Sequence, residues 1–123
     1  MMFEYRAQCL NVVDGDTVDL LVDLGFHDYR KERFRVLGVD TPELRAKEAA
    51  VRERAQAARA QVIEWLKPAV ANLAVWPLRI RTERDPDSFG RYLAAVWFVG
   101  DTGTERELGA ALVTAGLAVP YNP

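Results

Sequence analysis

The spacing of apolar residues changes at Pro42, and this change limits the folds open to the chain. Before Pro42, apolar and β-prone residues alternate with polar ones, which is typical of strands. After it, apolar residues recur at helical spacing, with Arg, Lys, Glu and Gln between them. They are Leu44, Val51, Ala55, Ala58, Val62, Trp65 and Ala69. Strands followed by one long amphipathic helix predict the α+β class.

Turn residues divide the chain into shorter elements. Five strands are predicted, at Phe3–Val13, Thr17–Val22, Tyr29–Val39, Trp76–Arg81 and Arg91–Val99. The long helix is expected to begin close to Pro42 and to end by Pro68, and a second helix is expected with Thr104 as its cap and Gly116 as its stop. A helix between the third and fourth of five strands predicts a mainly β, five-stranded oligonucleotide-binding (OB-fold) barrel with a C-terminal helix.

Length, composition and charge narrow the classes of function. A chain of 123 residues, half of them apolar, predicts a single domain over residues 1–123. The single Cys9 excludes an intramolecular disulfide, and with the lone His27 it excludes a Cys/His zinc site. A net charge of −2 argues against coating of duplex nucleic acid, so an anionic ligand would need a local basic patch. Without a signal segment or a membrane-length apolar run, the expectation is a cytoplasmic protein that does not bind membranes.

The segment Arg35–Glu43 places one cation and two carboxylates at the end of an apolar run. A purely structural interpretation is available, because Asp40 or Thr41 makes a good helix N-cap and Glu43 would complement the helix dipole. For this segment alone, that interpretation outweighs a functional one. The case for a site therefore depends on residues elsewhere in the chain.

Three other positions carry suitable chemistry. Asp16 lies in the first predicted hairpin turn, and its carboxylate oxygens suit calcium or magnesium, although for this turn taken alone an ordinary structural turn is the favoured interpretation. Val18 at the third ligand position excludes an EF-hand. Arg91 heads a strand, either as a solvated residue or as a phosphate ligand, since a guanidinium matches two phosphate oxygens. Tyr121 either stacks on a base or packs.

Four short blocks occur in an order and spacing that resemble the staphylococcal nuclease-like (thermonuclease) family. They are Val13–Val18, Arg35–Glu43, Asp87–Leu93 and Leu112–Ala118. The resemblance covers nearly the full chain. It implies a monomeric, calcium-dependent phosphodiesterase on an OB-fold barrel, an endonuclease or exonuclease that acts on DNA and/or RNA, preferentially single-stranded or frayed, and leaves 3′-phosphate ends.

The resemblance also implies a role for each matching residue. Asp16, Asp40 and the Thr41 carbonyl match the calcium ligands. Glu43 matches the general base, Arg35 and Arg91 match the residues that bind the scissile phosphate, and Tyr121 matches a substrate-binding position. These residue types suit the reaction, because attack on a phosphodiester builds negative charge that cations stabilise.

The chain departs from the family at Ser88 and Phe89, where a lysine and a tyrosine are common. The change predicts weaker capture of a terminal phosphate. One alternative remains a noncatalytic OB-fold module that binds nucleic acid or protein, and the complete catalytic set favours the enzyme over it. Another is a subunit whose partner supplies basic surface, an alternative motivated by the net acidity.

Overall fold

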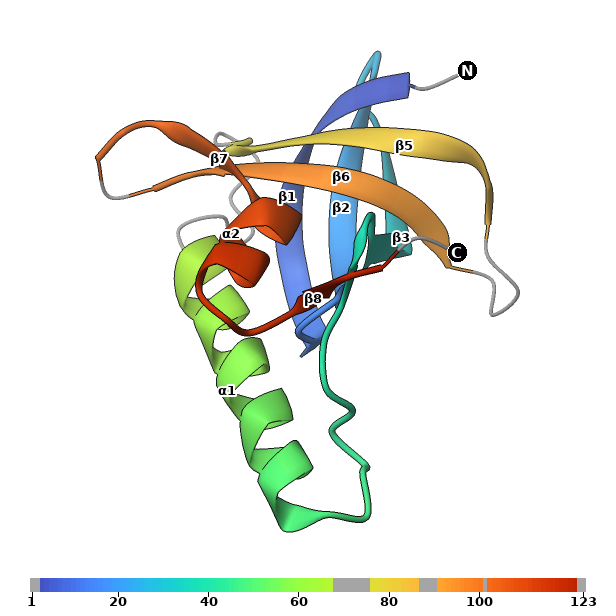
Figure 1. The fold of residues 1–123 in the computed structure, drawn as a ribbon. Helices are drawn as coiled ribbons and strands as arrows, with labels where there is room; N and C mark the ends of the chain where they lie inside the picture. The colour runs from blue at the N-terminus through green and yellow to red at the C-terminus, as the bar shows by residue number, and fades with distance from the viewer. Residues whose placement is uncertain (1–2, 68–75, 87–90, 101, 122–123) are drawn as a thin grey trace.

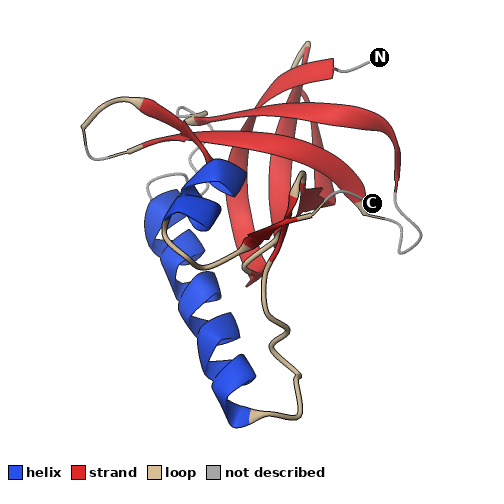
Figure 2. Cartoon of the chain, viewed as in Figure 1, coloured by secondary structure: helices blue, strands red, loops and turns tan. Residues whose placement is uncertain are grey.

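The computed structural model describes residues 3–67, 76–86, 91–100 and 102–121. Five long strands are present, β1 (Phe3–Asp14), β2 (Thr17–Gly25), β3 (Asp28–Val36), β5 (Leu78–Pro86) and β6 (Tyr92–Val99). Three short strands accompany them, β4 (Val39–Asp40), β7 (Glu105–Glu107) and β8 (Val119–Pro120). The helices are α1 (Ala49–Leu66) and α2 (Leu108–Thr114), shown in Figures 1 and 2. No helix in these ranges is long and apolar enough to cross a membrane.

The five long strands close into a barrel. Antiparallel pairing joins β3 to β2, β2 to β1, β1 to β5 and β5 to β6. A parallel pairing of β3 with β6 closes the ring, with Phe34 opposite Tyr92 and Val36 opposite Ala94. The barrel strands and the helix between the third and fourth of them confirm the predicted α+β, OB-fold class. Figure 1 shows α1 extending away from one end of the barrel.

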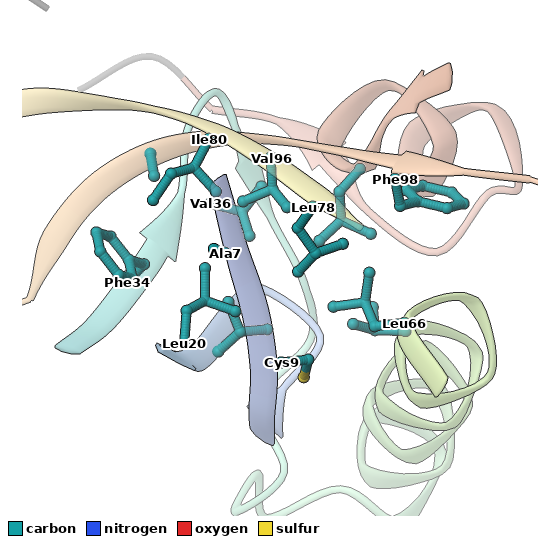
Figure 3. Packing of buried hydrophobic residues seen from close by; sticks show 14 of the residues in the cluster. Ala7, Cys9, Leu20, Phe34, Val36, Leu66, Leu78, Ile80, Val96 and Phe98 are labelled. Atoms are coloured by element: carbon teal, nitrogen blue, oxygen red, sulfur yellow. The ribbon is translucent and has the colours of Figure 1, made fainter. Parts of the chain in front are cut away.

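Alternation along the strands and one stripe of α1 build the hydrophobic core. On β3, Phe34 and Val36 are buried, whereas the side chains of Arg33 and Arg35 face away from the barrel interior, as the alternation predicts. The predicted helical stripe is buried at Ala55, Ala58, Val62 and Leu66. Figure 3 shows Leu66 approaching the buried side chains of the strands. Burial of this stripe holds α1 against the barrel.

Helix α1 begins later than predicted, at Ala49. The amide of Thr41 donates to Asp16 Oδ2 at 3.0 Å, which fixes the chain to the β1–β2 turn. Nearer the helix, Arg52 Nη1 donates to the carbonyl oxygen of Lys47 at 2.7 Å. The residues between β4 and Ala49 therefore form a loop that is tied to the β1–β2 turn at one end and to α1 at the other, although their composition favours a helix.

The prediction that Thr104 caps the second helix is also wrong. Residues Glu105–Glu107 pair with β6, so α2 begins only at Leu108. The predicted stop is confirmed: Gly116 has φ +74°, and the amide of Leu117 donates to the carbonyl oxygen of Leu112 at 2.9 Å. This left-handed glycine and the backward bond are the usual end of a helix.

The third strand ends at Val36, earlier than the predicted Val39. Gly38, with φ +80°, turns the chain, and the short strand β4 then pairs with β8. The amide of Tyr121 donates to the carbonyl oxygen of Gly38 at 2.8 Å. These bonds hold the segment around Tyr121 beside the end of β3.

Candidate active site

A pocket of about 490 Å³ opens where β1 and β3 end and where β2 and β6 begin. It contains every site residue predicted from the sequence except Tyr121. The lining residues are Val13, Asp14, Asp16, Thr17, Arg33, Arg35, Asp40, Thr41, Pro42, Glu43 and Arg91. Residues from both halves of the chain therefore share one cavity.

Asp16 connects three parts of this pocket. Its amide donates to Asp14 Oδ1 at 3.1 Å, a bond typical of a tight Asx turn. Its carbonyl oxygen accepts from the amide of Val36 at 2.8 Å, and its carboxylate accepts from the amide of Thr41 at 3.0 Å. These bonds fix the turn against the end of β3 and the loop after β4.

Gly15 allows the turn to approach its neighbours closely. A Cβ atom at this position would lie 2.8 Å from Thr41 Cγ2 and 2.9 Å from Ala58 Cβ. Both distances are well below normal carbon–carbon contact. The bare backbone of Gly15 therefore lets α1 and the loop after β4 pack directly on the turn that carries Asp16.

Arg35 lies between two carboxylates. Its Nη2 donates to Asp40 Oδ1 at 3.2 Å and to the carbonyl oxygen of Val39 at 2.9 Å, and its Nη1 lies 3.5 Å from Asp16 Oδ2. Its side chain is only 14% exposed. The guanidinium carbon is 5.2 Å from the ring centre of Tyr121, which places that ring next to the pocket. Asp16 and Asp40 thus converge on one positive charge.

Arg91 and Glu43 complete the predicted set. Arg91 directly precedes β6, and its Nη1 donates to Thr17 Oγ1 at 3.3 Å. Glu43 lines the pocket and is exposed. No hydrogen bond or ion pair joins its side chain to another residue in the described ranges. Its carboxylate is therefore accessible to a small molecule in the pocket.

The carboxyl groups of the turn differ in proton affinity. Burial, together with the hydrogen bond and charge of Asp16, raises the pKa of Asp14 to about 6. Burial alone would raise the pKa of Asp16 as well, but hydrogen bonds from Asp14 and the Thr41 amide, with the charge of Arg35, leave it lowered. Asp16 therefore stays ionised at neutral pH, and Asp14 is the member of the pair that takes up a proton first.

The donor atoms around Arg35 suit a hard cation. Asp16 and Asp40 supply carboxylate oxygens, the ligand type that calcium and magnesium prefer. Among the described residues, no group of three or more His, Cys, Asp or Glu side chains is arranged to hold a metal ion. A cation held here would therefore complete its coordination with backbone carbonyl, water or substrate oxygens.

Sequence reasoning gave no site role to two residues that line the pocket, Asp14 and Arg33. The signal for Arg33 was present, because alternation along a strand places it on the same face as Arg35. Asp14 was considered with Asp16 as a hard oxygen ligand for calcium or magnesium, against an ordinary turn, and was not included in the predicted site. The departures at Ser88 and Phe89 lie outside the described residues.

Comparisons with known proteins agree with this geometry. The family model described as staphylococcal nuclease homologue matches residues 33–123. The chain is 31% identical to "Protein ParB" of Escherichia coli over 122 residues, which are 96% of this chain and 58% of that protein. It is 37% identical to "Thermonuclease" of Staphylococcus intermedius over 91 residues, 73% of this chain and 46% of that protein. The chain belongs to the staphylococcal nuclease homologue family and spans about half the length of these relatives.

Proposed function

We propose that this chain is a calcium-dependent nuclease that hydrolyses phosphodiester bonds of DNA, RNA or both and leaves 3′-phosphate ends. The observation that carries the proposal is the convergence of Asp16 and Asp40 on Arg35, at 3.5 and 3.2 Å, inside one pocket. Membership of the family supports a nuclease-like function on nucleic acid. We propose single-stranded or frayed nucleic acid as the preferred substrate, held by the local cations of the pocket, because the net charge of −2 gives little general attraction to a polyanion.

The two arginines act on the phosphate. Attack on a phosphodiester increases the negative charge on the non-bridging oxygens, and guanidinium groups that face those oxygens stabilise the transition state. Arg35 is oriented by its carboxylate and carbonyl partners before substrate arrives. Arg91 approaches the same pocket from the start of β6. Arg35 on β3 and Arg91 just before β6 hold the phosphate together in this pocket.

Glu43 acts as the general base. Its exposed carboxylate has access to water in the pocket, and a positioned base typically contributes about 10² to 10⁴ in rate. Asp16, Asp40 and the Thr41 carbonyl would hold calcium, which supplies further positive charge against the phosphate oxygens. Tyr121, 46% exposed and beside Arg35, stacks on a base of the bound strand.

A noncatalytic OB-fold module that binds nucleic acid or protein is the second candidate. Two observations favour it: the described residues contain no cluster of three acidic, His or Cys side chains for a metal, and Arg35 is already paired with carboxylates. Such a module would bind an oligonucleotide without cutting it. Cleavage therefore distinguishes the two candidates directly.

The test is a cleavage assay on a single-stranded oligodeoxynucleotide with calcium, with magnesium or with chelator. The wild type is compared with Glu43→Gln and with Glu53→Gln, which removes an exposed carboxylate from α1 outside the pocket. We expect calcium-dependent cleavage by the wild type and Glu53→Gln, and a loss of about 10² to 10⁴ in Glu43→Gln. A product that a polymerase extends only after phosphatase treatment identifies a 3′-phosphate end.

The assay also has outcomes that reject the mechanism. Cleavage that persists in chelator, or that is undiminished in Glu43→Gln, would contradict it. Binding of the oligonucleotide without cleavage supports the noncatalytic module. Arg35→Ala and Arg91→Ala are expected to lower kcat more than they raise KM, and a change confined to KM would contradict a transition-state role.

A further inference from the structure

Arg33 is a third arginine of the pocket, and the roles proposed above do not use it. It precedes Arg35 by two residues on β3, so both side chains leave the same face of the strand, about 7 Å apart along it. The Arg33 side chain is 52% exposed, in contrast to 14% for Arg35. A positive group accessible to solvent therefore continues the cationic wall of the pocket along β3.

Asp19 orients Arg33. The two residues are directly opposite each other on β2 and β3. Arg33 Nε donates to Asp19 Oδ1 at 2.8 Å, and Nη2 donates to Oδ2 at 3.2 Å. The Asp19 side chain is only 12% exposed. Arginine carries five N–H donors, so this two-bond contact fixes the plane of the guanidinium and leaves other donors for a ligand.

The closure of the barrel brings Arg33 and Arg91 into one pocket. Tyr92 is opposite Phe34 at the end of the parallel pairing of β6 with β3, and the residues just before them, Arg91 and Arg33, both line the pocket. Asp19 balances part of the Arg33 charge, and a phosphate beside the solvent-exposed guanidinium would add a second favourable charge contact. Arg33 thus offers an anion a position that is displaced along β3 from Arg35, on the wall of the pocket that Arg91 also lines.

We propose that Arg33 binds a second phosphate of the substrate, the one next to the scissile phosphate, and so selects a polynucleotide over a substrate with a single phosphodiester. The inference rests on the proposed function, in which Arg35 and Arg91 hold the scissile phosphate. The half-exposed Arg33 guanidinium lines the pocket, where a substrate phosphate can reach it. The planar, pre-oriented guanidinium suits a phosphate of a single strand, whose backbone bends into a recessed site more readily than a duplex.

The test is binding of a labelled thymidine octanucleotide with calcium present. All variants carry Glu43→Gln, so that the strand stays intact, and a gel checks its integrity. Arg33→Gln is compared with Arg30→Gln, which makes the same charge change on β3 but removes a residue that is paired with Glu32 and absent from the pocket lining. We expect Arg33→Gln to weaken binding about three- to tenfold and to reduce the salt slope by about 0.7, with a smaller effect of Arg30→Gln.

A paired variant separates binding from folding. Arg33→Gln leaves the mostly buried Asp19 carboxylate without its partner, whereas Asp19→Asn combined with Arg33→Gln removes both charges. The double variant is expected to bind as weakly as Arg33→Gln and to melt close to the wild type. Recovery of binding in the double variant would assign the loss to misfolding and overturn the proposal.

Substrate length provides a second readout, measured with Glu43 intact. Arg33→Gln is expected to lower kcat/KM for the octanucleotide and to leave a dinucleotide with one phosphodiester unchanged. Three outcomes would overturn the assignment. Arg33→Gln could lower kcat/KM equally for the octanucleotide and the dinucleotide, or Arg30→Gln could weaken binding as much as Arg33→Gln does. The third outcome is a Glu43→Gln parent that does not bind the octanucleotide. If the nuclease proposal is wrong, the wild type binds the strand but does not cut it. In that case the binding comparison between Arg33→Gln and Arg30→Gln still tests the role of Arg33.

Discussion

Replacing Gly15 with alanine is expected both to destabilise the fold and to distort the pocket. The new methyl carbon would lie 2.8 Å from Thr41 Cγ2 and 2.9 Å from Ala58 Cβ. Favourable carbon–carbon contacts lie at about 3.5 to 4.0 Å, so one of the neighbours, or the turn itself, has to move by about 1 Å. The turn also carries Asp14 and Asp16, which would move with it.

The neighbours have little freedom to move. Ala58 is fully buried on α1, and its methyl group is attached directly to the helix backbone. The amide of Thr41 is bonded to Asp16, so the loop and the turn shift as one unit. Overpacking of a tight site costs about 1 to 3 kcal/mol, and the rigidity of both neighbours supports a value near 2 kcal/mol for Gly15→Ala.

Urea unfolding followed by tryptophan fluorescence measures this cost, because Trp65 stacks on Phe98 at 5.4 Å and reports on the core. Thr41→Ser removes the closest atom while keeping the backbone groups of Thr41. Gly15→Ala combined with Thr41→Ser is therefore expected to lose less stability than the two single changes added together. Two results would refute the packing argument. One is an unfolding free energy of Gly15→Ala within about 0.5 kcal/mol of the wild type. The other is a double variant whose loss of unfolding free energy equals the sum of the losses in the two single variants.

Two further changes test the core and the ion pair. Leu66→Ala is expected to cost about 2 to 5 kcal/mol in urea unfolding, because Leu66 is 1% exposed, whereas Ile63→Ala at an exposed position of α1 should cost far less; similar losses would contradict the core assignment. The hydrogen bond from Arg33 lowers the pKa of Asp19 below its ordinary 3.8, so the pair stabilises the fold above about pH 4 and this contribution is lost as the pH falls through the folded-state pKa. Asp19→Asn should therefore cost about 0.5 to 1 kcal/mol at pH 7 and less at pH 3, and an equal cost at both pH values would contradict the ion pair.

Local patterns in the sequence predicted much of the fold. Alternation identified Phe34 and Val36 as inward-facing residues, and helical spacing identified Val62 as part of the buried stripe. Gly116 was predicted to stop α2, and its φ of +74° bears this out. These features depend on residues close together in the chain, where side-chain period and turn chemistry act directly.

Element boundaries set by distant partners were not predictable in this way. Helix α1 begins only at Ala49, and the segment before it is tied through the Thr41 amide to a carboxylate on another hairpin. Residues Glu105–Glu107 form β7 because β6 offers an edge to pair with. Pairing with β6 replaces the predicted start of the second helix, and in both places nothing nearby in the sequence reveals the distant partner.

By itself, the sequence determined the chemical types available to the site and the strand–helix order that carries them. Only the tertiary structure decided their arrangement: the parallel closure of β3 with β6 brings Arg91 and Arg33 into one pocket, and the bond from the Val36 amide to the carbonyl oxygen of Asp16 holds the β1–β2 turn at the end of β3. Barrel closure joins residues that are far apart along the chain, and their separation in space depends on strand register. That register is why Asp16 meets Arg35, and it also aligns Arg33 along the same pocket wall.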